Sequence, residues 1–414
     1  MKNLETLIQE LCPDGVEYKN MEEVFEIRNG YTPSKNNPDF WEGGTIPWFR
    51  MEDIRQNGRI LSDAIQHITP AAIKGKGLFP ANSIIIATTA TIGEHALVIA
   101  DSLANQQFTN LTVRKSLSAC LLPKFVFYYM FVVDEWCKKN VNAGNFASVD
   151  MKRFKKIDFP LPPIEVQTEI VRILDKFTSL EAELEAELDC RKRQYEYYRD
   201  KLLSFENITP PERDKVVWKK MSEIGTFIRG NGLQKKNFTE EGVGCIHYGQ
   251  IYTHYGTSAT QTITCCSLEL AAKLRKASKG DIVIATTSEN VEDVCKAVAW
   301  LGEDNIAISG DAFIFKHHQN PKYIAYLFQT ADFFSYKKKK ATGTKVIRLS
   351  GDAMGNYLAP IPPLSEQQRI VDILDRFESL TTSLQSGLPA EIAARRQQYE
   401  HYRDKLLTFK RKTA

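Results

Sequence analysis

The sequence predicts an α+β (mixed α/β) chain in which two duplicated domains are separated by two long helices that form an antiparallel coiled coil. Three observations support this fold class. A block of sequence recurs in the second half of the chain. Each copy of that block carries an apolar stripe of helical spacing, and the region before each copy is rich in β-branched runs.

The internal repeat has two parts. Residues 160–180 share with 360–380 the pattern Pro-x-Pro-Pro, followed by Gln, Ile-Val, Ile-Leu-Asp, Phe and Ser-Leu, at an offset of 200 residues. Residues 194–203 match 398–407 at an offset of 204 residues. A period of this length is far too long for a solenoid, so the chain is predicted to be a duplicated two-part unit.

The apolar residues of each copy fall on an alternating four-three spacing, as in the seam of a coiled coil, which Glu181 and Arg191 interrupt in the first copy. They are Ile170, Leu174, Phe177, Leu184, Leu188, Tyr195, Tyr198 and Leu202 in the first copy, and Ile370, Leu374, Phe377, Leu384, Leu388, Tyr399, Tyr402 and Leu406 in the second. One such stripe alone is more typical of a core helix. Two matching stripes, each ~60 Å long if helical throughout, fit poorly inside two compact domains, so we expect the helices to pack on each other. Pro389 makes a break in the second helix the alternative.

The regions before the repeated blocks carry the strand signals. The runs 83–89 and 281–287 are β-branched and of strand length, and shorter strands are expected at 26–28, 109–114, 226–229 and 312–315. Short helices are expected at 123–133 and 321–330. The predicted domains are therefore 1–160 (with an N-terminal helix) and 208–360, with helical regions at 161–207 and 361–414.

Composition excludes several classes of protein. The 414 residues contain no apolar run of membrane-spanning length and no signal peptide, so we expect a cytoplasmic protein with no membrane partner. The eight cysteines form no CxxC pair and are expected to be reduced thiols. A net charge of +3 excludes a protein that coats nucleic acid by bulk charge, but it leaves local basic patches open.

No catalytic motif stands above background. The segment 37–40, Asn-Pro-Asp-Phe, is one residue from the Asn-Pro-Pro-Phe pocket of amino-methyltransferases, but a polar turn is the simpler interpretation. There is no P-loop, and the histidines and cysteines show no zinc spacing, so neither catalytic nor metal residues are assigned.

Local basic segments with aromatic and amide residues favour contact with nucleic acid. The densest is Tyr336 to Lys340, and basic residues recur at the same place in the first copy, although a solvated loop is the alternative for any lysine run. Asn105, Gln106 and Gln107 could read adenine edges or equally cap a turn. The full set of candidates is Arg28, Tyr31, Lys35, Arg50, Thr88, Thr89, Asn105, Gln106, Gln107, Asn145, Arg229, Lys235, Lys236, His247, Tyr248, Gln250, Thr286, Thr287, Lys337, Lys338, Lys339, Lys340, Lys345 and Arg348.

Two differing domains, each followed by a near-identical helical block, resemble the specificity subunit of type I restriction–modification enzymes. The shared Pro-x-Pro-Pro starts, the Gln-Tyr-Glu-x-Tyr-Arg-Asp-Lys-Leu-Leu ends and the opening Leu11-Cys-Pro-Asp-Gly-Val-Glu17 carry the resemblance. It implies a non-catalytic subunit in which each target recognition domain grips one half of a split site in double-stranded DNA, while the helices set the spacing.

The resemblance also implies partners. Two methyltransferase (modification) subunits would dock on the helices, and two restriction/translocase subunits would join them. This chain would hold no cofactor, and S-adenosylmethionine, ATP and Mg²⁺ would bind to the partners. The alternatives are a degenerate adenine-N6 DNA methyltransferase and an architectural coiled-coil DNA-binding scaffold.

Overall fold

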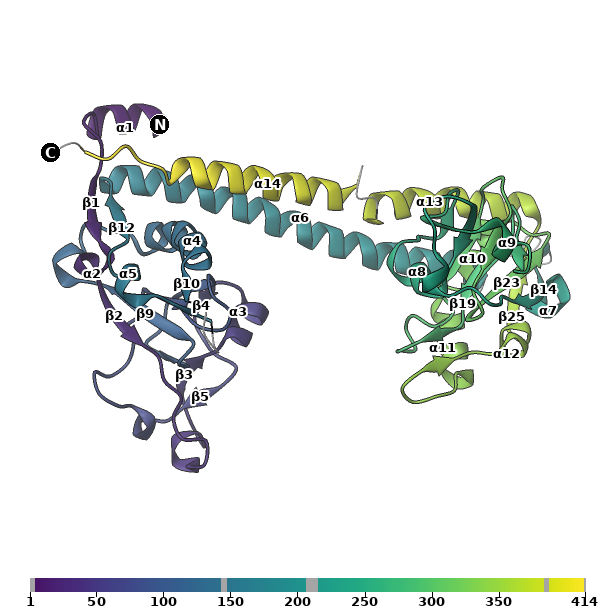
Figure 1. Cartoon of the computed structure of the whole chain (residues 1–414), viewed down its shortest axis with the longest axis horizontal. Helices are drawn as coiled ribbons and strands as arrows, with labels where there is room; N and C mark the ends of the chain where they lie inside the picture. The colour runs from purple at the N-terminus through teal and green to yellow at the C-terminus, as the bar shows by residue number, and fades with distance from the viewer. Residues whose placement is uncertain (1–3, 143–146, 206–214, 383–386, 413–414) are drawn as a thin grey trace. The chain divides into compact units, whose positions relative to one another are not determined.

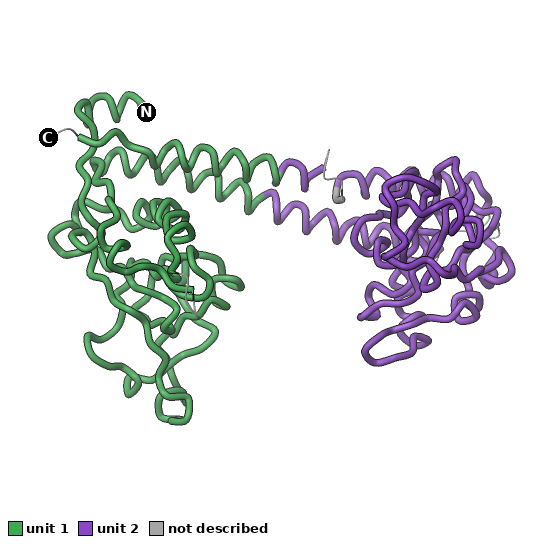
Figure 2. Tube along the Cα trace, viewed as in Figure 1, with its two compact units in different colours: residues 1–183, 392–414 green, residues 184–391 purple. Residues whose placement is uncertain are grey.

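The computed structural model describes residues 4–142, 147–205, 215–382 and 387–412. It divides into two compact units, 1–183 with 392–414 (unit 1) and 184–391 (unit 2), which are coloured separately in Figure 2. Among the described residues, no helix is both long and apolar enough to cross a lipid bilayer.

Unit 1 is built on a five-stranded sheet. Its order is β2 (Phe25–Asn29), β9 (Phe108–Val113), β6 (Ser83–Ala87), β7 (His95–Val98) and β4 (Ile60–Leu61), with only the β4–β7 pair parallel. The predicted strand at 83–89 is the central β6. Its alternate residues lie in two different hydrophobic clusters, one of which includes α4 (Pro123–Lys139). Because both faces of β6 are buried, its sequence is continuously apolar rather than alternating.

Smaller elements complete unit 1. A second sheet has the order β5 (His67–Ile68), β3 (Ile46–Phe49) and β8 (Leu103–Ala104), and β1 (Glu17–Asn20) pairs with β12 (Asp158–Leu161). The remaining elements are α1 (Leu4–Leu11), α2 (Met21–Val24), α3 (Met51–Asn57), α5 (Met151–Phe154), β10 (Val141–Asn142), β11 (Ser148–Val149) and the 3₁₀ turns η1 (Pro38–Phe40), η2 (Pro70–Ala72) and η3 (Lys115–Leu117).

Unit 2 repeats this topology. Its five-stranded sheet has the order β14 (Gly225–Arg229), β23 (Ala312–His317), β19 (Ile282–Ala285), β21 (Ala297–Trp300) and β16 (Ser258–Ala259), again with one parallel pair at the far edge. A second sheet has the order β17 (Thr264–Cys266), β15 (Val243–Ile246), β22 (Ile306–Ile308) and β18 (Lys276–Ala277), and β13 (Val217–Lys220) pairs with β25 (Leu358–Ile361). The duplication visible in the helical blocks therefore extends to the sheets, whose sequences differ.

The short helices differ from expectation at their ends. In unit 1, α4 runs six residues beyond the predicted end at Val133. In unit 2, the single helix predicted at 321–330 is two helices, α10 (Pro321–Leu327) and α11 (Ala331–Lys340), because the Thr330 hydroxyl accepts from Phe333 N and starts a new helix. The remaining elements of unit 2 are α7 (Met221–Ile224), α8 (Tyr248–Thr253), α9 (Leu268–Ala271), α12 (Gly351–Gly355), β20 (Thr287–Ser288), β24 (Ile347–Arg348) and η5 (Lys235–Asn237).

The repeated blocks are helical, as predicted. The first is one helix of 41 residues, α6 (Ile164–Ser204). The described part of the second consists of α13 (Leu364–Thr382) and α14 (Leu388–Leu406), both visible in Figure 1. Pro389 is the second residue of α14, where its missing N–H costs no helical hydrogen bond. The predicted seam residue Leu384 lies outside the described residues.

The apolar stripe of each block first packs in the core of its own domain and then contacts the other helix. Ile170 and Leu174 are fully buried in the core of unit 1, and Ile370 and Leu374 lie in that of unit 2, so the start of each stripe is a core helix of its own domain. The next stripe residue begins the helix–helix contact. Phe177 of α6 stacks on Tyr402 of α14 in unit 1, with ring centroids 5.6 Å apart.

The same stacking recurs in unit 2, where Phe377 lies 5.6 Å from Tyr198. In unit 1, Glu181 pairs with Arg396, which precedes Tyr402, so the two helices run antiparallel there as predicted. The other seven described stripe residues are half-buried: Leu184, Leu188, Tyr195, Leu202, Leu388, Tyr399 and Leu406.

Candidate nucleic-acid interface

Three segments far apart in the sequence meet at one end of the unit 1 sheet. Asn29 at the end of β2 pairs with Thr109 near the start of β9, and Ala87 at the end of β6 pairs with Phe108. The residues that continue from these strand ends, 30–32, 88–89 and 105–107, are therefore neighbours. Backbone hydrogen bonds hold them together, including Thr88 N to the carbonyl of Gln107 at 3.0 Å. We call this the sheet-end surface of unit 1.

Unit 2 has the same surface at the same end of its sheet. Ala285 pairs with Ala312, and Arg229 pairs with Phe313, so that 229–232, 286–287 and 309–311 come together. Thr286 N donates to the carbonyl of Asp311 at 3.0 Å, the counterpart of the bond between Thr88 and Gln107. The sequence-predicted candidates at 88–89, 105–107, 229 and 286–287 are thus brought together in two equivalent places.

In unit 1 the candidates divide into exposed and internally bonded side chains. Gln106 and Lys35 are exposed, and Thr89 is half-buried. The Asn105 carboxamide oxygen accepts from Gln107 N at 3.0 Å, so of the two interpretations of Asn105 the structure supports the turn cap. Thr88 is buried, and its hydroxyl lies 2.9 Å from that of Thr109.

The half-buried side chains of Arg28 and Tyr31 are hydrogen-bonded to a loop. The Arg28 guanidinium donates to the carbonyl of Leu78 at 3.1 Å and to those of Lys76 and Gly77. The Tyr31 hydroxyl donates to the carbonyl of Ala72 at 2.9 Å. Thr88, Arg28 and Tyr31 are therefore removed from the set that we propose to contact DNA. Arg50 stays in it as a half-buried side chain, 3.2 Å from Glu52.

In unit 2, Arg229 is the most prominent side chain of the sheet-end surface. It is 62% exposed, its Nε donates to the carbonyl of Gly310 at 2.7 Å, and its Nη2 lies 3.7 Å from Asp311. Asp311 was not identified from the sequence, because only the pairing of β14 with β23 brings it beside Arg229. An arginine donates hydrogen bonds, as the guanine edge requires, and an aspartate accepts them, as the cytosine amino group requires. The two side chains together are therefore able to discriminate a guanine from a cytosine edge.

Four candidates of unit 2 are buried. Thr286 and Thr287 are 5% and 7% exposed. His247 and Gln250 cap α8, since His247 Nδ1 accepts from Gly249 N and His247 N donates to Gln250 Oε1 at 2.8 Å. Gln250 Nε2 donates to the Thr264 hydroxyl. Burial, together with the nearby Lys235, lowers the pKa of His247. These four side chains stabilise the fold, so we remove them from the residues that we propose to contact DNA. Tyr248 is half-buried, and Lys235 and Lys236 are exposed.

The lysine run is divided by the helix on which it lies. Lys338, Lys339 and Lys340 are exposed on the last turn of α11, but Lys337 is only 4% exposed. The Lys337 ammonium donates to the carbonyls of Glu292 and Val294 at 2.7 Å each, and burial lowers its pKa. The expectation that Lys337 contacts phosphate is corrected, because its ammonium points into the protein.

The last two basic candidates lie on a loop that joins the sheet-end surface. Arg348 pairs with Thr287 between β24 and β20, and both Arg348 and Lys345 are exposed. The corresponding loop of unit 1 contains Asn145, which lies outside the described residues. In the segment 37–40, residues Pro38–Phe40 form the 3₁₀ turn η1, and Asn37 caps it because its Oδ1 accepts from Asp39 N at 3.1 Å, in agreement with the polar-turn interpretation.

Unit 1 and unit 2 thus carry the same arrangement of strand ends, with polar side chains at the same end of each sheet. The family model described as the type I restriction modification DNA specificity domain matches residues 13–189 and 214–394. The chain therefore belongs to the family of type I restriction–modification specificity proteins.

Curated relatives carry the same designation. The chain is 50% identical over 238 residues to the type I restriction enzyme EcoprrI specificity subunit of Escherichia coli, an alignment that covers 54% of this chain and 58% of the relative. It is 36% identical over 312 residues to the type I restriction enzyme EcoR124I/EcoR124II specificity subunit of the same organism. That alignment covers 70% of this chain and 71% of the relative.

Solved structures share the fold. A chain solved in work on complex assembly and conformational transition of the type I R-M system has a TM-score of 0.64 at 16% identity, with 95% of this chain and 97% of that chain covered. The HsdS subunit from Thermoanaerobacter tengcongensis has a TM-score of 0.50 at 15% identity, with 96% of each chain covered.

Proposed function

We propose that this chain is the non-catalytic DNA-recognition subunit of a type I restriction–modification complex. The observation that carries the proposal is the duplicated sheet-end surface. Each unit would read one half of a bipartite site in double-stranded DNA with the side chains at that surface, and the paired helices would set the spacing between the halves.

Exposed basic side chains would supply the phosphate contacts. Lys338, Lys339, Lys340, Lys345 and Arg348 serve this role in unit 2, because phosphate contact requires positive charge but no particular direction. Base reading would fall to side chains with directed hydrogen bonds, of which Arg229 and Asp311 in unit 2 and Gln106 in unit 1 have the required exposure and chemistry.

The chemistry would belong to the partners. Two methyltransferase subunits docked on the helices would supply S-adenosylmethionine and act at adenine, and two restriction/translocase subunits would use ATP and Mg²⁺. The rival enzyme hypothesis depends on Asn37 as part of a base pocket. Its carboxamide oxygen is engaged with Asp39 N, which supports the non-catalytic interpretation.

Two measurements test the proposal. Methylation mapping of DNA modified by the assembled complex should reveal one bipartite sequence with a fixed gap, and the complex without this chain should lose that specificity. Isothermal titration of the isolated chain with S-adenosylmethionine should show no stoichiometric binding. Micromolar binding of the cofactor by this chain would favour the methyltransferase alternative, and DNA binding without sequence preference would favour the architectural scaffold.

A further inference from the structure

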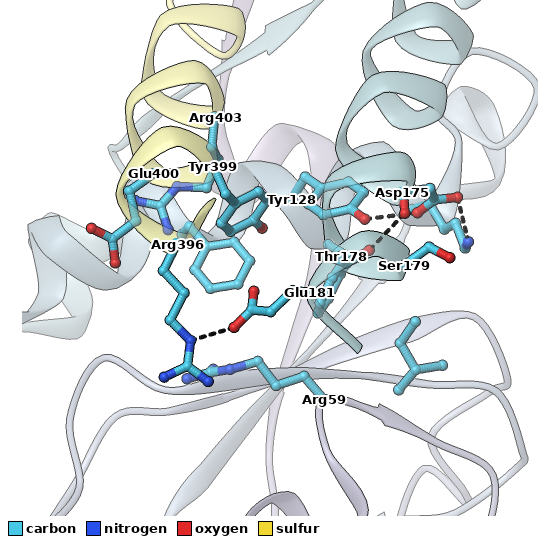
Figure 3. A pocket seen from close by; sticks show the side chains of 14 residues that line it. Arg59, Tyr128, Asp175, Thr178, Ser179, Glu181, Arg396, Tyr399, Glu400 and Arg403 are labelled. Carbon is cyan, nitrogen blue, oxygen red and sulfur yellow. Dashed lines mark hydrogen bonds and ion pairs between the residues drawn. The ribbon is translucent and has the colours of Figure 1, made fainter. Parts of the chain in front are cut away.

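The same polar contact joins the mixed domain to the helix that follows it in both units. In unit 1, Lys124 Nζ of α4 lies 2.6 Å from Asp175 Oδ2 of α6, and the Tyr128 hydroxyl donates to Asp175 Oδ1 at 2.7 Å (Figure 3). Asp175 thus accepts one bond at each carboxylate oxygen, both from α4. Burial, followed by the bond to Asp175, raises the pKa of Tyr128, so its hydroxyl keeps the proton that it donates.

Unit 2 reproduces this contact with its own residues. Lys322 Nζ lies 2.6 Å from Asp375 Oδ2, and the Tyr326 hydroxyl donates to Asp375 Oδ1 at 2.6 Å. The lysine and tyrosine follow a proline at the first position of α10, as Lys124 and Tyr128 follow Pro123 in α4.

A buried glutamine makes a second contact nearer the start of each helix. Gln167 is fully buried, its Oε1 accepts from Leu122 N at 2.9 Å, and its Nε2 donates to the carbonyls of Cys120 and Pro162 at 2.6 and 2.7 Å. The Gln167 amide therefore uses its oxygen and both of its N–H groups in hydrogen bonds to the backbone that leads into α4 or into α6.

Gln367 does the same in unit 2. Its Oε1 accepts from Asn320 N at 2.9 Å, and its Nε2 donates to the Pro362 carbonyl and to Gln319 Oε1 at 2.8 Å each. We call Lys124, Tyr128, Gln167 and Asp175 joint 1, and Lys322, Tyr326, Gln367 and Asp375 joint 2.

Two anchor points fix an orientation that apolar packing alone leaves free. Gln167 and Asp175 are eight residues apart, which is ~12 Å along a helix. Contacts such as those of Ile170 and Leu174 are non-directional, so they tolerate small rotations of the helix against the domain. Hydrogen bonds at both ends do not, because a rotation would leave a buried amide unpaired, at a cost of about 1–3 kcal/mol.

We propose that joints 1 and 2 are positioning devices that set the angle at which each domain meets DNA, and thereby fix the gap length that the complex accepts. This inference rests on the proposed function. None of the joint residues belongs to a sheet-end surface, so they would act through the domain they orient. DNA turns by roughly 35° per base pair, so a domain free to rotate by a comparable angle could engage a half-site displaced by one base pair.

The two joints are not equally strong. Position 178 is threonine in unit 1, whereas its counterpart Glu378 accepts a hydrogen bond from the Thr257 hydroxyl. Glu378 Oε2 also lies 2.9 Å from the Tyr326 hydroxyl, whose single proton it shares with Asp375. Gln329 extends this network, because it donates to Thr257 and accepts from the Tyr195 hydroxyl of α6. Joint 2 therefore keeps bonds to α13 when Asp375 is removed, and joint 1 is the more sensitive target.

The test uses Lys124→Met combined with Tyr128→Phe in the complete chain, assembled with its modification subunits. Both changes keep the apolar body of the side chain, and the Asp175 side chain that they leave unpaired is 36% exposed, so the fold is retained. DNA substrates carry both half-sites with gaps shortened or lengthened by one base pair. The variant should modify these relative to the native gap about tenfold more readily than the wild type, with both half-sequences unchanged.

Arg172→Met is the matched control, since it removes an ion pair that Arg172 makes within α6 to Glu169 and joins no domain to the helix. It should leave gap selectivity unchanged. The equivalent change of Lys322 and Tyr326 should relax the gap less, because Glu378 keeps its bond to Thr257.

A double variant that folds and keeps the wild-type gap selectivity would overturn the role of the joints while leaving the proposed function intact. A wild-type complex that modifies no bipartite site would instead overturn the proposed function itself. If the double variant does not assemble, Asp175→Asn replaces it, and an unchanged gap in that variant counts equally against the joints.

Discussion

Lys337 and the three lysines that follow it should behave as two different kinds of residue. We expect Lys337→Met to destabilise unit 2, and the combined change of Lys338, Lys339 and Lys340 to alanine to leave stability within about 0.5 kcal/mol while weakening binding to DNA. The sequence alone assigned all four lysines to phosphate contact, and only the structure distinguishes Lys337 from the other three.

The magnitude follows from the two bonds that the Lys337 ammonium donates to the carbonyls of Glu292 and Val294. A bond from a charged donor contributes ~1.5–3 kcal/mol. Methionine would remove both bonds and leave the two carbonyls unpaired. It would also remove the cost of burying a charge, and that cost is why the pKa of Lys337 is lowered. The net loss should be about 2–4 kcal/mol.

Native-state hydrogen exchange of the amides around Val294 measures the first effect, because it reports the stability of unit 2 separately. Fluorescence anisotropy of the assembled complex on DNA across a salt series measures the second. The triple alanine variant should lower the slope of log K against log salt by up to ~2.7, about 0.9 for each phosphate that a lysine no longer neutralises. The reasoning would be refuted if Lys337→Met kept its exchange protection and lowered the salt slope as the other lysines do.

Three further outcomes are expected. Exchanging residues 20–160 for the same region of a related subunit should change one half of the methylated sequence only, and a change in both halves would show that the units do not read DNA independently. Inserting a third Glu-Ala-Glu-Leu after Leu188 adds ~6 Å and ~40° beyond a full turn to α6, and should lengthen the gap by one base pair, at most two, in methylation mapping; an active variant with the native gap would contradict this. Burial lowers the pKa of His317 to about 4, so folding keeps this group neutral while the unfolded chain binds a proton below about 6.5. Unit 2 should therefore lose stability as the pH falls from 6.5 to 4, and His317→Gln should flatten that decline in calorimetry.

Much of the architecture was predictable from the sequence because it depends on local patterns of residues. The recurrence of Pro-x-Pro-Pro with its following Gln, Asp and Phe positions predicted two units and two helical blocks. The stacking of Phe177 on Tyr402 and of Phe377 on Tyr198 confirms that the stripes pair helices. Spacing along a helix determines which side chains share a face, so this level of structure needs no knowledge of distant contacts.

The candidate site was predictable in position but not in detail. The sequence predicted strands that end near 89, 229 and 287, and the pairing of antiparallel strands brings these ends together at one end of each sheet. Which of their side chains face solvent was not predictable. Threonine is a residue type that can read bases, and only the burial of Thr286, which is 5% exposed, separates it from an exposed base reader.

What the sequence by itself determined is therefore the duplication, the helices and the family. The tertiary structure alone decided that Lys337 serves the fold, that Asp311 stands beside Arg229, and that Lys124 and Tyr128 anchor Asp175. The physical reason is distance along the chain. Each of these contacts joins residues that are far apart in the sequence, and the free energy of burying or pairing a polar group depends on partners that only the folded chain brings within bonding range.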